Sequence, residues 1–334
     1  MTPVELSRTV LHAVRRAVDE GELSVAVPEK VKVGPPGPGG RGDYATNVAL
    51  QLARPAGRPP RQVAEVLRSY LAGAEGVRDV AVTGPGFLNI SLALDAGAEL
   101  VRKILRDGAR YGHSDALAGQ VLALRVPYEV RAEVVADALG RIIASQGGRV
   151  EVLRGSRSGA RGEVPHGEPV DLRPVPAPQD PASLGPDAAR WALLYPAPHD
   201  RPRIGAEHLV QRESNPLFRV RYAHARTRAL GRNAADLGFG AEPGPGPGGD
   251  ALVALLADHP RILAASAAHR APDRLARHLV TVADAVLALL PGVLPRGDEK
   301  PSAAHRARLA LAEVAGTVLA GGLSLLGIDA PDHL

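Results

Sequence analysis

The chain has 334 residues, of which 45% are apolar but only 3% aromatic, and its formal net charge is +4 at neutral pH. This length allows two or three domains, whose cores must consist mainly of Ala, Val and Leu. Cysteine is absent, which excludes disulfides, thiolate nucleophiles and every zinc site with a cysteine ligand.

The basic charge comes almost entirely from arginine, because the chain has only four lysines, Lys30, Lys32, Lys103 and Lys300. Alanine, glycine and proline are also abundant, so the arginines are as consistent with GC-rich coding as with selection for phosphate binding. Charge alone therefore does not establish a nucleic-acid partner. No run approaches the roughly 20 apolar residues of a membrane span, and a basic-then-apolar signal segment is missing. We expect a cytoplasmic protein without a membrane partner.

The first third of the sequence predicts a compact α+β domain over residues 1–112. Thr2 is a suitable N-cap and Pro3 a suitable first residue for an amphipathic helix. A strand at 31–33 is followed by a Gly/Pro-rich loop and then by helices at 46–53 and 59–72. Strands at 77–82 and 87–92 flank the turn at 84–86, and a further helix runs to residue 105.

Residues 113–185 predict a short α/β remnant. One strand–helix–strand unit occupies residues 120–126, 129–146 and 150–153, whereas a doubly wound sheet requires several such units. The Gly-, Pro- and Arg-rich stretch from Arg154 to Pro186 has little periodicity and is interpreted as an irregular connector.

Residues 186–334 predict an all-α bundle, with helices near 187–195, 215–237, 251–269, 273–290 and 302–326. The helix at 215–237 has Asn215 as its N-cap, and its arginines recur at helical spacing in two adjacent stripes. One stripe is Arg221, Arg228 and Arg232; the other is Arg219 and Arg226. Guanidinium groups bind phosphate and a nearby flat ring stacks on an unpaired base. Alternatively, the arginines form a solvated face while Tyr222 and His224 are partly buried.

Four short motifs resemble those of arginyl-tRNA synthetases, in that family's order. The strings GDYATN (42–47) and GPGFLN (84–89) resemble its N-terminal additional domain. The strings NPLFRVRYAHAR (215–226) and GIDAPDHL (327–334) resemble its DALR-type anticodon-binding domain, over residues 185–334 in all. Arg219 stands where an aromatic residue is usual and Arg221 where glutamine is usual. These departures put discrimination between anticodon sequences in doubt. Because both add positive charge, they leave affinity for phosphate in place or strengthen it.

The resemblance implies a tRNA partner, with arginine-specific tRNA as the candidate, held at the D-loop corner by the N-terminal domain and at the anticodon stem-loop by the C-terminal domain. Tyr44 offers a stacking face, although it could equally pack inside, and Asp43 is expected to cap the following helix. Asn47 and Gln51 lie one helical turn apart and present paired amides to base edges. The candidate RNA-binding residues are Tyr44, Asn47, Gln51, Asn89, Phe218, Arg221, Tyr222, His224, Arg226 and Arg228.

The ATP-binding signatures of that family are missing. A His-x-Gly-His turn is required, yet no histidine occurs between His113 and His166, and no lysine between Lys103 and Lys300 supports the second signature. Arg154, Arg157 and Arg161 would be poorly preorganised on a Gly/Ser connector. We therefore expect no catalytic residue, cofactor or metal, with enzymatic activity left open.

Three hypotheses remain from the sequence. The favoured one is a non-catalytic tRNA-binding protein, a shortened paralogue that keeps the two RNA-binding ends and lacks most of the catalytic core. The second is an interaction module that has lost RNA binding and contacts a full-length synthetase or another protein. The third is residual arginine–tRNA ligase activity that needs a partner.

Overall fold

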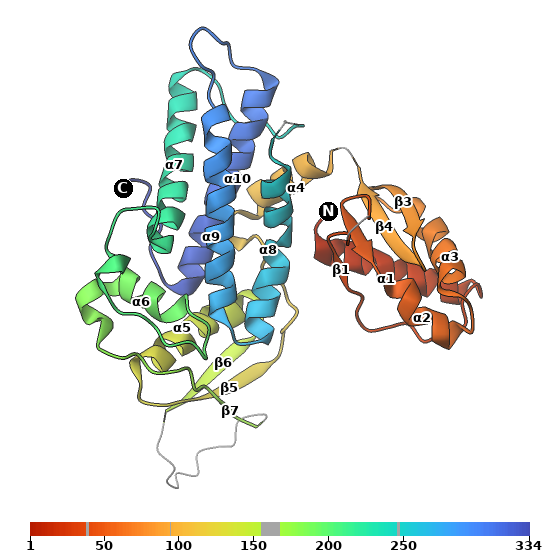
Figure 1. The fold of residues 1–334 in the computed structure, drawn as a ribbon, viewed down its shortest axis with the longest axis horizontal. Coiled ribbons are helices and arrows are strands. Elements are labelled where there is room, and N and C mark those ends of the chain that lie inside the picture. Colours follow the sequence, from red (N-terminus) through yellow and green to blue (C-terminus); the bar gives the residue numbers. More distant parts are fainter. Residues whose placement is uncertain (38–39, 94, 155–167, 246–247) are drawn as a thin grey trace. The chain divides into compact units, whose positions relative to one another are not determined.

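A computed structural model describes residues 1–37, 40–93, 95–154, 168–245 and 248–334 and divides into two compact units, residues 1–100 and 101–334 (Figure 1). The expected fold class is confirmed, with an α+β first part, a short α/β piece and a helical C-terminal part. The three domain ranges 1–112, 113–185 and 186–334 stay a prediction, since one compact unit can hold more than one domain.

The first unit is a four-stranded antiparallel sheet with helices packed on it. The strand order is β1-β2-β4-β3, and the strands are β1 (Val33–Gly34), β2 (Tyr44–Thr46), β3 (Val77–Thr83) and β4 (Phe87–Leu92). The helices are α1 (Pro3–Asp19), α2 (Val48–Ala56) and α3 (Pro60–Ala72), while α4 (Ala96–Asp107) crosses the boundary between the units. The predicted start of α1 is confirmed, because Thr2 and Glu5 form a reciprocal capping box.

The motif at residues 42–47 forms a strand rather than the start of a helix. Asp43 does not cap α2; its Oδ2 accepts a hydrogen bond from the Leu92 N–H at 2.7 Å and so ties this segment to β4. In the GPG turn, Gly86 has φ +141° and an added Cβ would lie 2.8 Å from the Pro60 carbonyl oxygen. The glycine is therefore required by both its conformation and the close approach of α3.

The second unit begins with the predicted strand–helix–strand unit. Strands β5 (Val121–Val126) and β6 (Arg149–Arg154) pair in parallel around α5 (Val130–Ser145). A further parallel strand, β7 (Val170–Asp171), adds to β5 and gives the order β6-β5-β7.

The described part of the expected connector, residues 168–186, has little regular secondary structure, as expected, but it is packed against the rest of the unit rather than being a free linker. Leu172 and Leu184 are each 8% exposed, and a 3-10 turn covers Pro181–Leu184. Arg154 ends β6. Residues 155–167, with Arg157 and Arg161, lie outside the described residues.

One buried arginine ties this segment to α5. The Arg131 side chain is 1% exposed, and all five of its N–H groups donate to backbone carbonyls. Its Nε donates to Leu193 (3.0 Å), Nη1 to Val175 and Asp200 (both 2.7 Å), and Nη2 to Pro196 (3.1 Å) and Ala197 (2.9 Å). A single side chain of α5 therefore binds five backbone carbonyls that lie between residues 175 and 200.

The rest of the second unit is a helical bundle. Its helices are α6 (Pro186–Leu194), α7 (Pro216–Asp236), α8 (Asp250–Ala268), α9 (Pro272–Leu289) and α10 (Ala303–Leu326), each within one residue of its predicted range. Helices α7, α9 and α10 lie side by side (Figure 1). Their facing surfaces bury mainly Leu, Val and Ala, as the low aromatic content predicts.

The expectation that no segment reaches membrane-span length is wrong for three helices of this bundle. By length and composition alone, α8, α9 (extended to Gly292) and α10 are long and apolar enough to cross a membrane. Their apolar windows are 39%, 56% and 67% buried against the rest of the protein.

Two buried imidazoles stack where α8 meets α9. The centroids of the His259 and His278 rings are 5.3 Å apart, and the Tyr111 ring also stacks on His259, with centroids 5.9 Å apart. His259 Nδ1 and His278 Nε2 are buried without a hydrogen-bond partner in the described structure. Burial lowers the pKa of His278 to about 4 and that of His259 well below its ordinary value.

Candidate nucleic-acid interface

The first unit brings two of its candidate residues together on α2. The Gln51 Nε2 donates to Asn47 Oδ1 at 3.1 Å, one helical turn away, and the pair is exposed. Asn47 is the N-cap residue, but its side chain makes no capping bond, so its amide stays turned to the neighbouring Gln51. The remaining amide donor of Asn47 and acceptor of Gln51 have no partner among the described residues. They can therefore pair with the edge of an unstacked base.

Two other candidates in this unit are core residues, which corrects their expected roles. Tyr44 is 8% exposed and belongs to the hydrophobic core, because strand alternation in β2 turns Tyr44 and Thr46 inward. Asn89 is 3% exposed, and its Nδ2 donates to Thr83 Oγ1 at 2.6 Å, closing the β3–β4 hairpin. Neither side chain presents a face to RNA.

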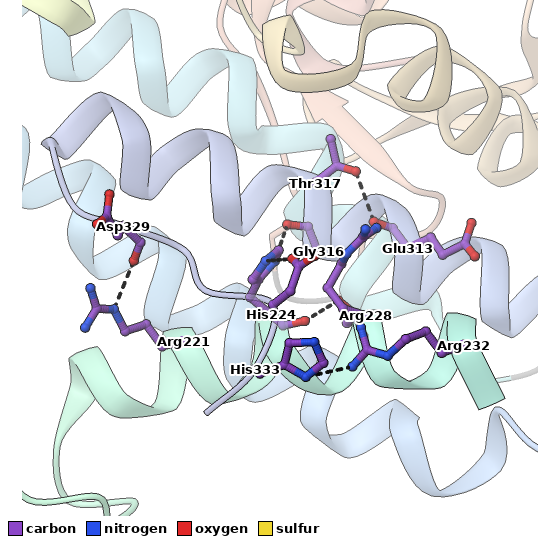
Figure 2. Close-up of polar contacts among 11 residues, drawn as sticks. Arg221, His224, Arg228, Arg232, Glu313, Gly316, Thr317, Asp329 and His333 are labelled. Carbon is purple, nitrogen blue, oxygen red and sulfur yellow. Dashed lines mark hydrogen bonds and ion pairs between the residues drawn. The ribbon is translucent and has the colours of Figure 1, made fainter.

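On α7, one face is covered by residues 329–333, which we call the tail (Figure 2). The Arg221 Nε donates to the Asp329 carbonyl at 3.0 Å, and its Nη2 pairs with the Asp187 carboxylate. About two helical turns further along α7, the Arg228 Nε contacts Asp332 Oδ1 at 3.2 Å. At the next turn, Arg232 Nη2 contacts His333 Nδ1 at 3.4 Å. Each arginine of this stripe therefore contacts the protein itself, although Arg228 and Arg232 stay exposed.

His224 lies beneath the tail and is 4% exposed. Its Nδ1 faces the Gly316 carbonyl at 3.1 Å (Figure 2). Its Nε2 faces Asp332 Oδ1 at 3.3 Å. Both partners are acceptors, so both ring nitrogens donate only when the imidazole is protonated. Desolvation raises the pKa of Asp332, but Arg228 and His224 outweigh it and hold that pKa below its ordinary value. His224 is thus a buried structural residue, which corrects its expected RNA contact.

A second face of α7 remains open and carries Phe218, Tyr222 and Arg226, which we call the open stripe. These residues are spaced four apart, so they follow one line along the helix. The rings of Phe218 and Tyr222 stack at 5.5 Å with an interplanar angle of 19°, and Tyr222 is 39% exposed. Arg226 is exposed and has no hydrogen-bond or ion-pair partner within the described ranges. In contrast, the neighbouring Arg219 pairs with Asp284 at 3.2 Å.

The sequence predicts all three residues of the open stripe as RNA-binding candidates, but the prediction does not distinguish them from the arginines that the tail contacts. The helical period contains that distinction, because at 3.6 residues per turn the open stripe lies roughly 100° around α7 from Arg221, Arg228 and Arg232. The open stripe offers an aromatic platform followed by a cation, a combination that suits an unpaired base and its phosphate.

The N-terminus of α5 was not singled out, although it follows a parallel strand as phosphate-binding helices do. Here a carboxylate occupies it. Glu129 Oε1 accepts from the Arg131 N–H at 3.0 Å and Oε2 from the Ala132 N–H at 2.9 Å. An anion at this position would meet a negative charge and amide groups that are already bonded. Glutamate is not one of the usual N-cap residues (Ser, Thr, Asp and Asn), so the capping signals of the sequence do not identify Glu129.

Comparison with protein families matches both ends of the chain. Residues 5–92 match the family described as "Arginyl tRNA synthetase N terminal domain", and residues 220–334 match "DALR anticodon binding domain". The second range includes Tyr222 and Arg226 of the open stripe.

Two curated relatives are arginine–tRNA ligases. That of Frankia alni is 43% identical over 161 residues, which are 44% of this chain and 28% of the ligase. That of Renibacterium salmoninarum is 50% identical over 125 residues, 36% of this chain and 23% of the ligase. The alignments thus take in less than a third of the length of either relative.

Solved structures show the same fold at low sequence identity. The Thermus thermophilus arginyl-tRNA synthetase aligns with a TM-score of 0.70 at 16% identity, covering 100% of both chains. The Plasmodium falciparum enzyme aligns with a TM-score of 0.66 at 9% identity, covering 99% of both chains.

Proposed function

We propose that this chain, which joins an arginyl-tRNA synthetase N-terminal domain to a DALR anticodon-binding domain, binds tRNA without aminoacylating it. The observation that carries the proposal is the open stripe, a stacked aromatic pair whose Tyr222 ring is exposed, followed by Arg226, which has no partner among the described residues. The anticodon loop is single-stranded, so its bases can stack on Tyr222 while Arg226 binds the adjoining phosphate. Asn47 and Gln51 provide a separate contact to the outer corner of the tRNA. A cytoplasmic location is part of this proposal.

The absence of ligase activity is supported by the chemistry of the α5 N-terminus. The Glu129 carboxylate already accepts hydrogen bonds from the Arg131 and Ala132 amides and places a negative charge there, which disfavours a triphosphate. The lack of a nearby His-x-Gly-His turn and of a lysine between Lys103 and Lys300 points the same way. In this proposed function the protein binds tRNA, and a different protein activates the amino acid.

Replacing Tyr222 by alanine is expected to weaken tRNA binding by about 1–3 kcal/mol, roughly 5- to 150-fold, because one base loses its stacking partner. Arg226→Ala is expected to lower affinity and to reduce the slope of log K against log salt by about 0.7–0.9, the value of one phosphate contact. Fluorescence polarisation with labelled tRNA at several salt concentrations measures both effects.

The matched control is Arg274→Ala, which removes one exposed arginine from α9, outside the open stripe. It is expected to leave affinity within about twofold and the salt slope unchanged. Equal binding by wild type, Tyr222→Ala and Arg226→Ala would contradict the role of the open stripe. No binding to tRNA even at low salt would contradict the proposed function and favour the interaction-module hypothesis.

An ATP–pyrophosphate exchange assay with arginine and tRNA is expected to give no signal above the protein-free blank. The physical reason is that the described structure provides no preorganised cation for the leaving pyrophosphate. Exchange that depends on this protein would contradict the non-catalytic half of the proposal, while leaving tRNA binding intact.

A further inference from the structure

A cavity of about 450 Å³ lies between α7, α10 and the tail, and Ala109 also lines it. Its size lies in the range of small-molecule sites. The wall on α10 consists of small residues, Gly316, Ala320 and Gly321, so no bulky side chain fills the space. The cavity does not include any residue of the open stripe.

One wall carries a carboxylate without a counter-charge. Glu313 on α10 is half-buried, and its carboxylate has no hydrogen-bond or ion-pair partner within the part of the chain that the structure describes. Gly231 of α7 faces it, and an added Cβ there would lie 3.4 Å from Glu313 Oε1. Burial raises the pKa of Glu313, and Arg228 offsets this only in part. A cation in the space beside Gly231 would stabilise the ionised carboxylate.

The opposite charge stands on α7, one turn before Gly231. Arg228 is exposed, and only its Nε has a partner in the described structure, namely Asp332 at 3.2 Å. Its two terminal nitrogens are therefore available to an anion from the cavity. Arg228 and Glu313 do not form an ion pair with each other, although both line the same hollow (Figure 2).

We propose that this cavity binds a free α-amino acid, whose ammonium group contacts Glu313 and whose carboxylate contacts Arg228. A small zwitterion matches Glu313 and Arg228, which face the same cavity without pairing; Asp332 also lines this cavity, but it bonds the Arg228 Nε and leaves the two terminal nitrogens unbonded in the described structure. The aliphatic side chain would lie along Ala320 and Gly321 toward Ser324, which are on the same side of α10 as Glu313. The site is independent of RNA binding, since its residues and those of the open stripe do not overlap.

Ligand-observed NMR titration with three probes tests each charge separately. L-norleucine carries both charged groups, pentylamine lacks the carboxylate and hexanoate lacks the ammonium. L-norleucine is expected to bind with a Kd on the order of millimolar, pentylamine about tenfold more weakly, and hexanoate without measurable affinity. Hexanoate or pentylamine binding as tightly as L-norleucine would overturn the proposal.

Glu313→Gln is expected to weaken L-norleucine binding by about tenfold or more, because the charge-assisted bond is lost. The matched control, Glu213→Gln, neutralises an exposed and unpartnered glutamate of the same unit and is expected to leave binding unchanged. Gly231→Val supplies an independent test, since its methyl groups would occupy the space beside the carboxylate without altering any charge; it is expected to abolish binding. Wild-type affinity in either Glu313→Gln or Gly231→Val would overturn the assignment.

Discussion

Arg131→Met is expected to lower the free energy of unfolding of the second unit by about 3–5 kcal/mol, the largest effect of any single substitution considered. Methionine has a similar volume but no hydrogen-bond donor, so five carbonyls lose their partner at once. Urea unfolding followed by tryptophan fluorescence measures the change. The chain has one tryptophan, Trp191, which is fully buried in α6 close to the Arg131 contacts.

Two further substitutions show whether the stability depends on the hydrogen-bond donors of the guanidinium or on its positive charge. Arg131→Lys retains the charge but loses the planar five-donor fork, and it is expected to recover only a minor part of the lost stability. Arg125→Met removes an exposed arginine that pairs with Asp171 at 2.8 Å, and a loss of less than about 1 kcal/mol is expected. If Arg131→Met were no more destabilising than Arg125→Met, the carbonyl cluster would not depend on the guanidinium.

Acidification from about pH 6.5 to about pH 4 is expected to destabilise the second unit steeply. In the unfolded chain His259 and His278 take up protons near pH 6.5, whereas in the folded protein burial keeps the pKa of His278 at about 4 and that of His259 still below the ordinary range. The unfolded state therefore binds more protons in this window, and stability falls as the pH falls. With two such groups, the slope reaches about 2.7 kcal/mol per pH unit at most.

The charged groups around the pair are few. Asp258 raises and Arg261 lowers the pKa of His278 after the larger effect of burial, while His278 and His113 lower that of His259. His278→Phe keeps a stacked ring but removes one titrating group, so the slope of stability against pH is expected to fall to about half. His199→Phe is the control, because this ring is exposed. Urea titrations at pH 7, 6 and 5 give the slopes, and an unchanged slope in His278→Phe would show that acid sensitivity arises elsewhere.

The sequence predicted elements whose signals are local. Thr2 and Asn215 identify helix starts because a cap is set by the next three residues, and the helices of the bundle follow from apolar periodicity. The open stripe could be drawn from the sequence as well, since the residues 218, 222 and 226 are linked by helical spacing alone.

The remaining features depend on partners that are far apart in the chain. Nothing near Arg221 in the sequence predicts that the Asp187 carboxylate will neutralise its charge. Nor does anything there predict that the Asp329 carbonyl will accept a hydrogen bond from its Nε. In the same way, residues 168–186 have the composition of a linker, yet the carbonyl of Val175 is bound by Arg131, 44 positions earlier. Tyr44 was misplaced because a motif fixes which residues occur, whereas the pairing of β2 with β4 decides which of them face the core.

The two faces of α7 are subject to different constraints during sequence divergence. A change at Arg221 leaves Asp187 without its counter-charge, and a change at Arg228 removes the nearest cation from Asp332, so these positions must coevolve with their partners. Tyr222 and Arg226 form no hydrogen bond or ion pair with a distant residue of the described structure, so under the proposed function selection on them follows the ligand. Under the proposed function, a change of RNA ligand would therefore alter one side of a single helix while the other side preserves the bundle.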